Sequence, residues 1–278
     1  MVFIEESRSF WPLFPLQRSF SGDRKLSRSN SSESSDPEDK DDARSWDIAE
    51  SVERGLAREL TADFLCPLAK SHGFHRFRVE RSTDRLHFRV YRESGEFLMF
   101  ASAAKDFERI NIYTYDPQTD DSLLYDPDRP AFTMALSQSR TDYQLVQERC
   151  DRCRHCQGHT SCNCGGQQDL MCVSMSRQEV GDGTNYRMSA SLGDKVPLCR
   201  LVTKSPRWDK KLECMVLNFK GRKVHASAKN FQLTLKNDPD TVICQHGKIA
   251  PDTFALDCRS PLTFIQAFGA SLATMDWQ

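Results

Sequence analysis

The spacing of hydrophobic residues changes along the chain from a four-residue period to a two-residue period. Over residues 47–65, apolar side chains recur every four residues with charged residues between them, which predicts an amphipathic helix. From residue 66 onward, short segments alternate apolar and polar positions, as half-buried β-strands do. Such segments lie at 74–80, 86–92, 97–102, 110–115, 143–147, 186–190, 213–219, 231–235, 241–246 and 253–257.

Turn residues such as Ser94-Gly95, Asp116-Pro117 and Asn237-Asp238-Pro239 separate these segments. Many short strands without alternating helices are typical of an antiparallel barrel or sandwich. We therefore predict a mainly β domain over residues 66–278.

Residues 261–275 depart from the strand pattern. They begin with Ser260-Pro261, a helix cap followed by proline at the first helical position. Apolar residues surround the whole axis of the predicted helix, which is too short to span a bilayer comfortably. A helix that is apolar on every side must be enclosed, and here the sheet must enclose it. The sequence therefore predicts a closed antiparallel β-barrel around a buried helix over 261–275.

Residues 1–46 are rich in serine and charged residues and poor in apolar ones, so we predict a disordered, acidic tail. The segment 28–31 has a context that favours phosphorylation, and a passive solubilising tail is the alternative. No secretory signal or run of about 18 apolar residues is readable, so we expect a reducing, intracellular compartment.

The charges are segregated along the chain. The 38 Lys+Arg nearly balance the 39 Asp+Glu, and nucleic acid is not an expected partner. Residues 1–50 are acidic, whereas residues 199–225 carry a strong basic excess. These cations either adsorb to an anionic leaflet or are ordinary outward-facing strand residues. Lys220 and Arg222 flank a turn glycine, and we expect both to be solvated.

Six of the 11 cysteines fall within residues 150–172, which we interpret as a Cys-rich insertion. Three interpretations are open: a structural zinc site, S-acylation or redox chemistry of exposed thiols, and a flexible loop with incidental cysteines. No other cofactor is expected. The candidate zinc ligands are Cys150, Cys153, Cys156, Cys162, Cys164 and Cys172.

Motifs of catalysis are missing from the sequence, which has no P-loop, no Gly-x-Ser-x-Gly and no His-Glu-x-x-His. We therefore do not expect an enzyme.

Several short sequence motifs lie after residue 203. They are Lys204-Ser-Pro-Arg-Trp208, Leu217-Asn-Phe-Lys-Gly-Arg222, Ala226-Ser-Ala-Lys-Asn-Phe-Gln232, Gln245-His-Gly-Lys248, Phe254-Ala-Leu-Asp257 and Pro261-Leu262 leading to Gln266-Ala-Phe268. In their order and spacing these motifs resemble the C-terminal domain of the tubby-like proteins. Glu96-Phe-Leu-Met-Phe-Ala101 and Asn111-Ile-Tyr-Thr-Tyr-Asp-Pro117 extend the resemblance upstream.

This resemblance implies a twelve-stranded closed barrel threaded by a hydrophobic helix. It also implies reversible binding of phosphatidylinositol bisphosphates at the cytoplasmic leaflet and no catalysis. Family members act as membrane-tethered adaptors in signalling and in delivery of membrane cargo to cilia. The implied location is the cytoplasm and its membrane surface, with the cilium or nucleus as further sites.

The resemblance also implies a lipid site built from Lys105, Arg109, Asn111 and Arg187. Lys105 and Arg109 are what remains of the family's basic run, and Asp106 and Glu108 lie between them. The family's next Lys-Leu-Arg element reads 135-Ala-Leu-Ser-137 in this chain. The basic pocket is therefore depleted.

We hypothesise a phosphoinositide- or anionic-membrane-binding adaptor that carries membrane-protein cargo or trafficking partners. The alternative is a protein-interaction or nuclear regulatory scaffold with a zinc-clipped Cys-rich loop.

Overall fold

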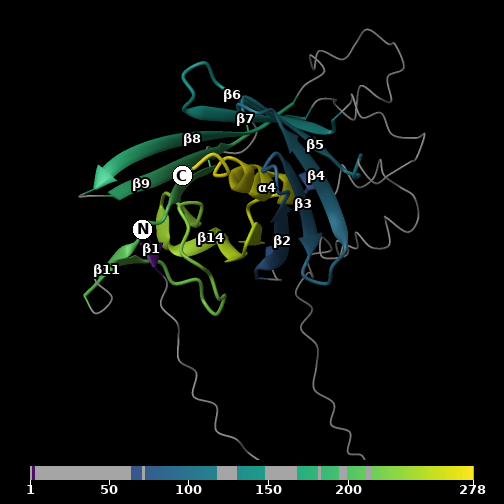
Figure 1. Ribbon diagram of the computed structural model, residues 1–278. Helices are drawn as coiled ribbons and strands as arrows, with labels where there is room; N and C mark the ends of the chain where they lie inside the picture. The colour runs from purple at the N-terminus through teal and green to yellow at the C-terminus, as the bar shows by residue number, and fades with distance from the viewer. Residues whose placement is uncertain are drawn as a thin grey trace, which may run out of the picture.

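The computed structural model describes residues 2–3, 64–70, 73–117, 130–147, 168–180, 183–193, 199–210 and 214–277. Twelve antiparallel strands close into a barrel around one helix (Figure 1), which confirms the predicted fold class. In barrel order the strands are β10 (Cys199–Thr203), β13 (Phe231–Leu235), β14 (Asp238–Ala250), β15 (Thr253–Cys258), β2 (His75–Arg81), β3 (His87–Arg92), β4 (Phe97–Ala103), β5 (Arg109–Tyr113), β6 (Phe132–Leu136), β7 (Asp142–Gln147), β8 (Gln168–Val180) and β9 (Gly183–Leu192), which pairs again with β10.

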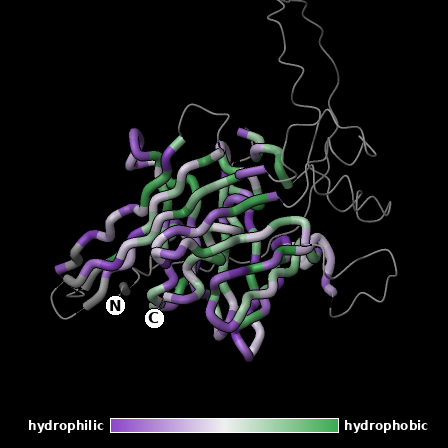
Figure 2. The backbone as a smooth tube through the Cα atoms, turned by 90° about the horizontal axis from the view of Figure 1, so that it is seen from above, coloured by the Kyte–Doolittle hydropathy of each residue, from purple (hydrophilic) through white to green (hydrophobic). Residues whose placement is uncertain are grey.

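Alternation along the strands directs apolar side chains into the barrel. In β3, Phe88 and Val90 are fully buried, whereas His87 and Arg89 between them are partly exposed. Hydrophobic residues gather along the barrel strands and hydrophilic residues at many of the turns (Figure 2). The hydrophobic core thus lies between the inner face of the sheet and the helix.

The enclosed helix, α4 (Phe264–Leu272), is buried at every residue. It is shorter than the predicted 261–275, and Ser260 is not its N-cap. Thr263 caps it instead, because its Oγ1 accepts a hydrogen bond from the Gln266 amide at 3.3 Å and its own amide donates to Gln266 Oε1 at 3.0 Å. Gln266 Nε2 also donates to the Leu170 carbonyl of β8 at 2.9 Å.

The segment 217–230 packs on the outside of the barrel. Its apolar residues Leu217, Phe219 and Val224 form a small cluster with Ile249 of β14. Gly247 of β14 lies directly beneath this segment, and a Cβ atom there would lie 2.6 Å from Val224 Cγ1.

The expectation that Arg222 is solvated is wrong, because Arg222 anchors this outer segment. Its Nη2 and Nε donate to the Asp257 carboxylate of β15 at 2.6 and 3.1 Å, and Asp257 is 2% exposed. Gln245 Nε2 donates to the same carboxylate at 2.8 Å. A buried carboxylate needs such partners, and Arg222 is therefore held rather than solvated.

A three-stranded sheet lies outside the barrel and contains β1 (Val2–Phe3), β12 (Cys214–Val216) and β11 (Arg207–Asp209). Val2 and Phe3 belong to the predicted tail 1–46, whose other residues lie outside the described ranges. Of the predicted helix 47–65, only Phe64 and Leu65 are described, and both are helical. Phe64 packs against Phe264 of α4 with a ring-centroid distance of 5.4 Å.

Candidate functional site

One end of the barrel, which we call the hairpin end, carries five connections between strands. They are the turns of β2–β3, β4–β5, β6–β7 and β14–β15 and the β8–β9 hairpin. Main-chain hydrogen bonds join neighbouring turns: the Arg81 amide donates to the Asp252 carbonyl and the Leu136 amide to the Glu108 carbonyl, both at 2.8 Å. Pairing of β7 with β8 stops at Ser174, whereas β8–β9 pairing continues to Val180. The β8–β9 hairpin therefore projects beyond the barrel (Figure 1).

Three successive turns of the hairpin end share one geometry. Each holds a non-glycine residue in the left-handed region, namely Arg85, Phe107 and Arg140, with φ of 66°, 59° and 56°. The amide of each bonds to the carbonyl three residues earlier. This conformation costs a bulky residue on the order of 1 kcal/mol.

Lys105, Arg109 and Asn111 of the predicted lipid site lie together in and after the β4–β5 turn. Lys105 is exposed. Arg109 is exposed and donates from Nε to Asn111 Oδ1 at 3.1 Å and from Nη2 to Thr133 Oγ1 at 3.4 Å. Asn111 therefore orients the Arg109 guanidinium along the outer surface.

Arg140 of the β6–β7 turn joins this group and was missed by the sequence analysis. Its Nη1 donates to Glu108 Oε1 at 2.9 Å and its Nη2 to the Asp106 carbonyl at 3.1 Å. Both partners lie in the same turn as Lys105. The alternation of Phe132, Met134 and Leu136 is the signal that could have found β6 and, with it, this turn.

Arg187, the remaining predicted residue, lies apart from the others on β9. The ladder that starts at Arg109 runs through Ala135, Gln144 and Cys172 and reaches β9 at Ser191. Arg109 and Arg187 are thus four strands apart across the sheet, at about 4.8 Å per strand, and four residues apart along the strand direction, at about 3.3 Å per residue. The structure brings together three of the four predicted residues.

Tyr143 of β7 ties the β4–β5 turn to the barrel. Its hydroxyl donates to the Phe107 carbonyl at 3.0 Å. Burial, followed by the charge of Asp276, raises the pKa of Tyr143 to about 12, so the hydroxyl stays protonated and keeps donating near neutral pH.

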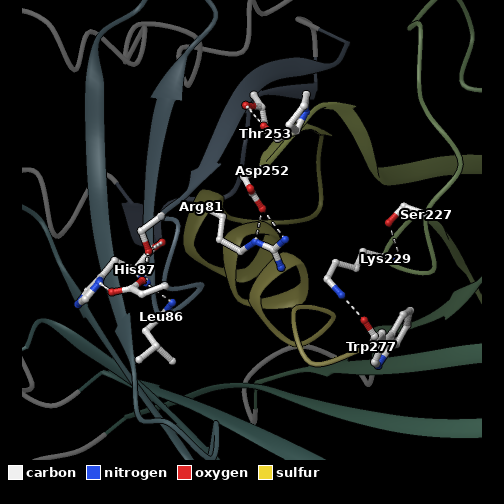
Figure 3. Close-up of polar contacts among 11 residues, drawn as sticks. Arg81, Leu86, His87, Ser227, Lys229, Asp252, Thr253 and Trp277 are labelled. Atoms are coloured by element: carbon white, nitrogen blue, oxygen red, sulfur yellow. Dashed lines mark hydrogen bonds and ion pairs between the residues drawn. The ribbon is translucent and has the colours of Figure 1, made fainter.

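Lys229 lies at the same end, beside the residues that follow α4. Its Nζ donates to the carbonyl oxygen of Trp277 (Figure 3). Burial, followed by the nearby positive charge of Arg81, lowers the pKa of Lys229 to about 8. Arg81 itself pairs with Asp252, with Nε and Oδ1 separated by 2.9 Å.

The predicted zinc ligands other than Cys172 lie outside the described residues, so the zinc site stays a prediction. β8 begins at Gln168, within the predicted insertion 150–172. Cys172 is half-buried on β8 opposite Gln144, and burial raises the pKa of its thiol. Within the described ranges, no group of three or more His, Cys, Asp or Glu residues could hold a metal ion.

Among the helices that the structure describes, none combines the length and the apolar character needed to cross a membrane.

Comparison with known proteins gives one consistent match. A family model described as the Tub family matches residues 114–277. Human Tubby-related protein 3 is 47% identical over 79 residues, which are 28% of this chain and 18% of that protein. Tubby-like F-box protein 5 of Oryza sativa subsp. japonica is 45% identical over 124 residues, 40% of this chain and 29% of that protein. Tubby protein homolog 1 of Caenorhabditis briggsae is 42% identical over 82 residues, 30% of this chain and 19% of that protein. The chain therefore spans less than a third of the length of each of these relatives.

Proposed function

The chain belongs to the Tub family, and from this premise we propose that it is a non-catalytic adaptor that binds phosphoinositides at an anionic membrane surface. The hairpin end of the barrel makes the contact. Membrane-protein cargo or trafficking partners are the partners of such an adaptor, and the cytoplasmic leaflet, including that of the cilium, is its place of action.

The observation that carries the proposal is the meeting of two turns at the hairpin end. Arg140 bonds to the turn that carries Lys105 and Arg109, so three cations come from adjacent turns. Guanidinium groups form charge-assisted hydrogen bonds to phosphate, often in pairs, and a lysine adds a point charge. This arrangement suits an inositol headgroup that carries more than one phosphate.

Asp106 and Glu108 lie in the same turn and limit the strength of the site. The Arg140–Glu108 pair is more than half exposed at both side chains, so it contributes little to stability and can exchange for a ligand phosphate. Each cation near an anionic leaflet contributes about 1 kcal/mol. We therefore expect weak, salt-sensitive binding.

Vesicle flotation tests the proposal. The full chain is mixed with phosphatidylcholine vesicles that contain either phosphatidylinositol bisphosphate or phosphatidylserine at equal total charge, at low and at physiological salt. We expect preferential flotation with the bisphosphate lipid at both salt concentrations. Equal flotation with the two lipids would reduce the function to diffuse adsorption, and no flotation would overturn the proposal.

Three variants locate the contact. Lys105→Gln with Arg109→Gln removes two cations from one turn, and Arg140→Asn removes the third, because asparagine tolerates the left-handed conformation. We expect each to lower bisphosphate binding at least threefold. Arg200→Gln on β10 is the matched control, since Arg200 is exposed outside both turns. An effect of Arg187→Gln as large as that of Arg140→Asn would move the site to β9.

A further inference from the structure

A cavity of about 500 Å³ lies at the hairpin end, against the projecting part of the β8–β9 hairpin. Pockets of this volume are large enough for a small ligand or an anchoring side chain. The wall combines cationic, acidic and aromatic residues from four parts of the chain. It is formed by Arg140, Thr141, Met175, Ser176, Arg177, Tyr186, Asp276 and Trp277.

Two arginines from different elements supply the positive charge of this cavity. Arg140 comes from the β6–β7 turn, and Arg177 is an exposed residue of β8 beyond the barrel. Thr141 and Ser176 also line the cavity, and the Thr141 hydroxyl donates to Asp142. The planar fork of a guanidinium group is suited to a planar oxyanion such as a carboxylate.

The aromatic part of the wall is a stacked pair. Tyr186 of β9 and Trp277 have ring centroids 5.0 Å apart and an interplanar angle of 16°. Trp277 is 6% exposed, and its amide and carbonyl bond to the Thr274 carbonyl and to Lys229 Nζ. Tyr186 lies opposite Arg177 in the β8–β9 ladder, so the ring and the cation share one face of the hairpin.

Asp276 decides which anion fits. Its carboxylate lines the same cavity, and it opposes a doubly charged phosphate more strongly than a singly charged carboxylate. Arg140 already pairs with Glu108, but both side chains of that pair are more than half exposed, so the ligand carboxylate can replace Glu108 at Arg140 while Arg177 offsets Asp276. The rigid aromatic wall and the adaptable Met175 favour an apolar group attached to that carboxylate.

We propose that this cavity is the partner-docking site of the chain, and that it binds a short protein segment in which an acidic side chain lies beside an aromatic or large aliphatic one. The carboxylate of the segment bonds to Arg177 and Arg140, and its apolar side chain packs on Tyr186, Trp277 and Met175. The inference rests on the proposed adaptor role, since an adaptor needs a partner site in addition to its lipid contacts; Arg140 borders both sites, whereas Arg177 and Tyr186 belong to the partner site alone.

A random decapeptide library displayed on phage, selected on the immobilised full chain, tests the inference. We expect enrichment of peptides with Asp or Glu within two positions of Phe, Tyr, Trp or Leu. A synthetic peptide of the enriched sequence is then titrated in solution by calorimetry. A selection without enrichment, or an enriched set without acidic residues, would overturn the inference.

Variants of the cavity wall give the second test. Arg177→Gln should weaken the synthetic peptide at least tenfold, and Tyr186→Ala should do the same, whereas Tyr186→Phe keeps the ring and should bind within threefold of the parent chain. Arg200→Gln is the charge-matched control. Unchanged affinity in Arg177→Gln and Tyr186→Ala, with native thermal unfolding, would contradict the proposal.

Lipid and peptide measurements on the same proteins keep the two proposals apart. Lys105→Gln with Arg109→Gln should weaken vesicle binding at least threefold and leave peptide affinity unchanged, and Arg177→Gln should weaken the peptide at least tenfold and leave vesicle binding unchanged. Displacement of the peptide by 10 mM inorganic phosphate as readily as by 10 mM acetate would show a general anion site and overturn the preference for carboxylate. Loss of vesicle flotation alone would remove the membrane proposal and leave the peptide site in place.

Discussion

At the scale of single residues, His246 shows how burial in the barrel keeps an ionisable side chain uncharged. It is fully buried, and its ring stacks between Phe231 and Phe254 at centroid distances of 5.4 and 5.0 Å. Neither ring nitrogen has a hydrogen-bond partner among the described residues. Burial, followed by the charge of Lys229, lowers the pKa of His246 to about 3.

This pKa predicts a specific loss of stability in acid. Between pH 6.5 and about 3 the unfolded chain binds a proton on this histidine that the folded chain does not, so the free energy of unfolding falls as pH falls. From pH 7 to pH 5 the loss from this group is about 2 kcal/mol. His246→Phe should lose about that much less than the parent chain, as measured by urea denaturation at both pH values. Parallel losses in the two proteins would contradict the assignment.

Individual side-chain partners were the least predictable part of the molecule. The dipeptide Gly221-Arg222 indicates a turn, but the hydrogen-bond partner of Arg222 is Asp257, which lies 35 residues further along the chain. The partners of Arg140 are equally distant in sequence, since Glu108 and Asp106 precede it by more than 30 residues. Sequence spacing cannot reveal such pairs, since they depend on which turns the barrel brings together.

At the scale of elements, the outer segment 217–230 depends on the missing side chain of Gly247. A Cβ there would lie 2.6 Å from Val224 Cγ1 and 3.2 Å from Phe219 Cε1. Alanine at this position must push the segment away from β14 or distort the strand.

Gly247→Ala should therefore lower the free energy of unfolding by about 1–3 kcal/mol, as overpacking does. In the double variant with Val224→Ala, part of the lost free energy of unfolding should be recovered, because the clashing methyl groups of Val224 are absent. Urea denaturation of the parent chain, both single variants and the double variant completes the cycle. Additive losses would show that the two residues do not interact.

The predicted element boundaries were wrong where one prominent sequence feature obscured a second one. The cluster of cysteines led us to place residues 150–172 in an insertion, and it hid the alternation of Met171, Val173 and Met175 that defines β8. Ser260-Pro261 suggested a helix start, but the reciprocal bonds of Thr263 and Gln266 begin α4 later. Alternation sufficed for strands such as β3 and β13, which stand alone between clear turns.

At the scale of the whole molecule, the closed barrel follows from one sequence feature. An all-round apolar helix after a series of short strands must be surrounded by them, and α4 is buried at every residue. The positions of the candidate lipid-site residues did not follow in the same way. Arg187 matches the family's sequence yet lies on a different part of the sheet from Arg109, because register around the barrel is set by pairing and not by motif.

Enclosure of α4 predicts how the molecule opens. Water reaches the helix amides only when strands separate, so amides of residues 265–272 should exchange with the free energy of global unfolding. Hydrogen exchange followed at several urea concentrations checks this, with the exposed β4–β5 turn as a fast-exchanging reference. Exchange of α4 at a clearly lower free energy than β13 and β14 would show that the barrel opens locally around it.

The burial of α4 also sets the order of events while the chain is being made. All twelve strands leave the ribosome before residues 264–277, and their inner faces have no filling until those residues emerge. A chain whose translation stops short of this stretch presents the complete apolar lining of a barrel to chaperones and proteases. The barrel core can therefore be completed only once residues 264–277 are present, and until then the apolar inner faces of its strands stay exposed to solvent.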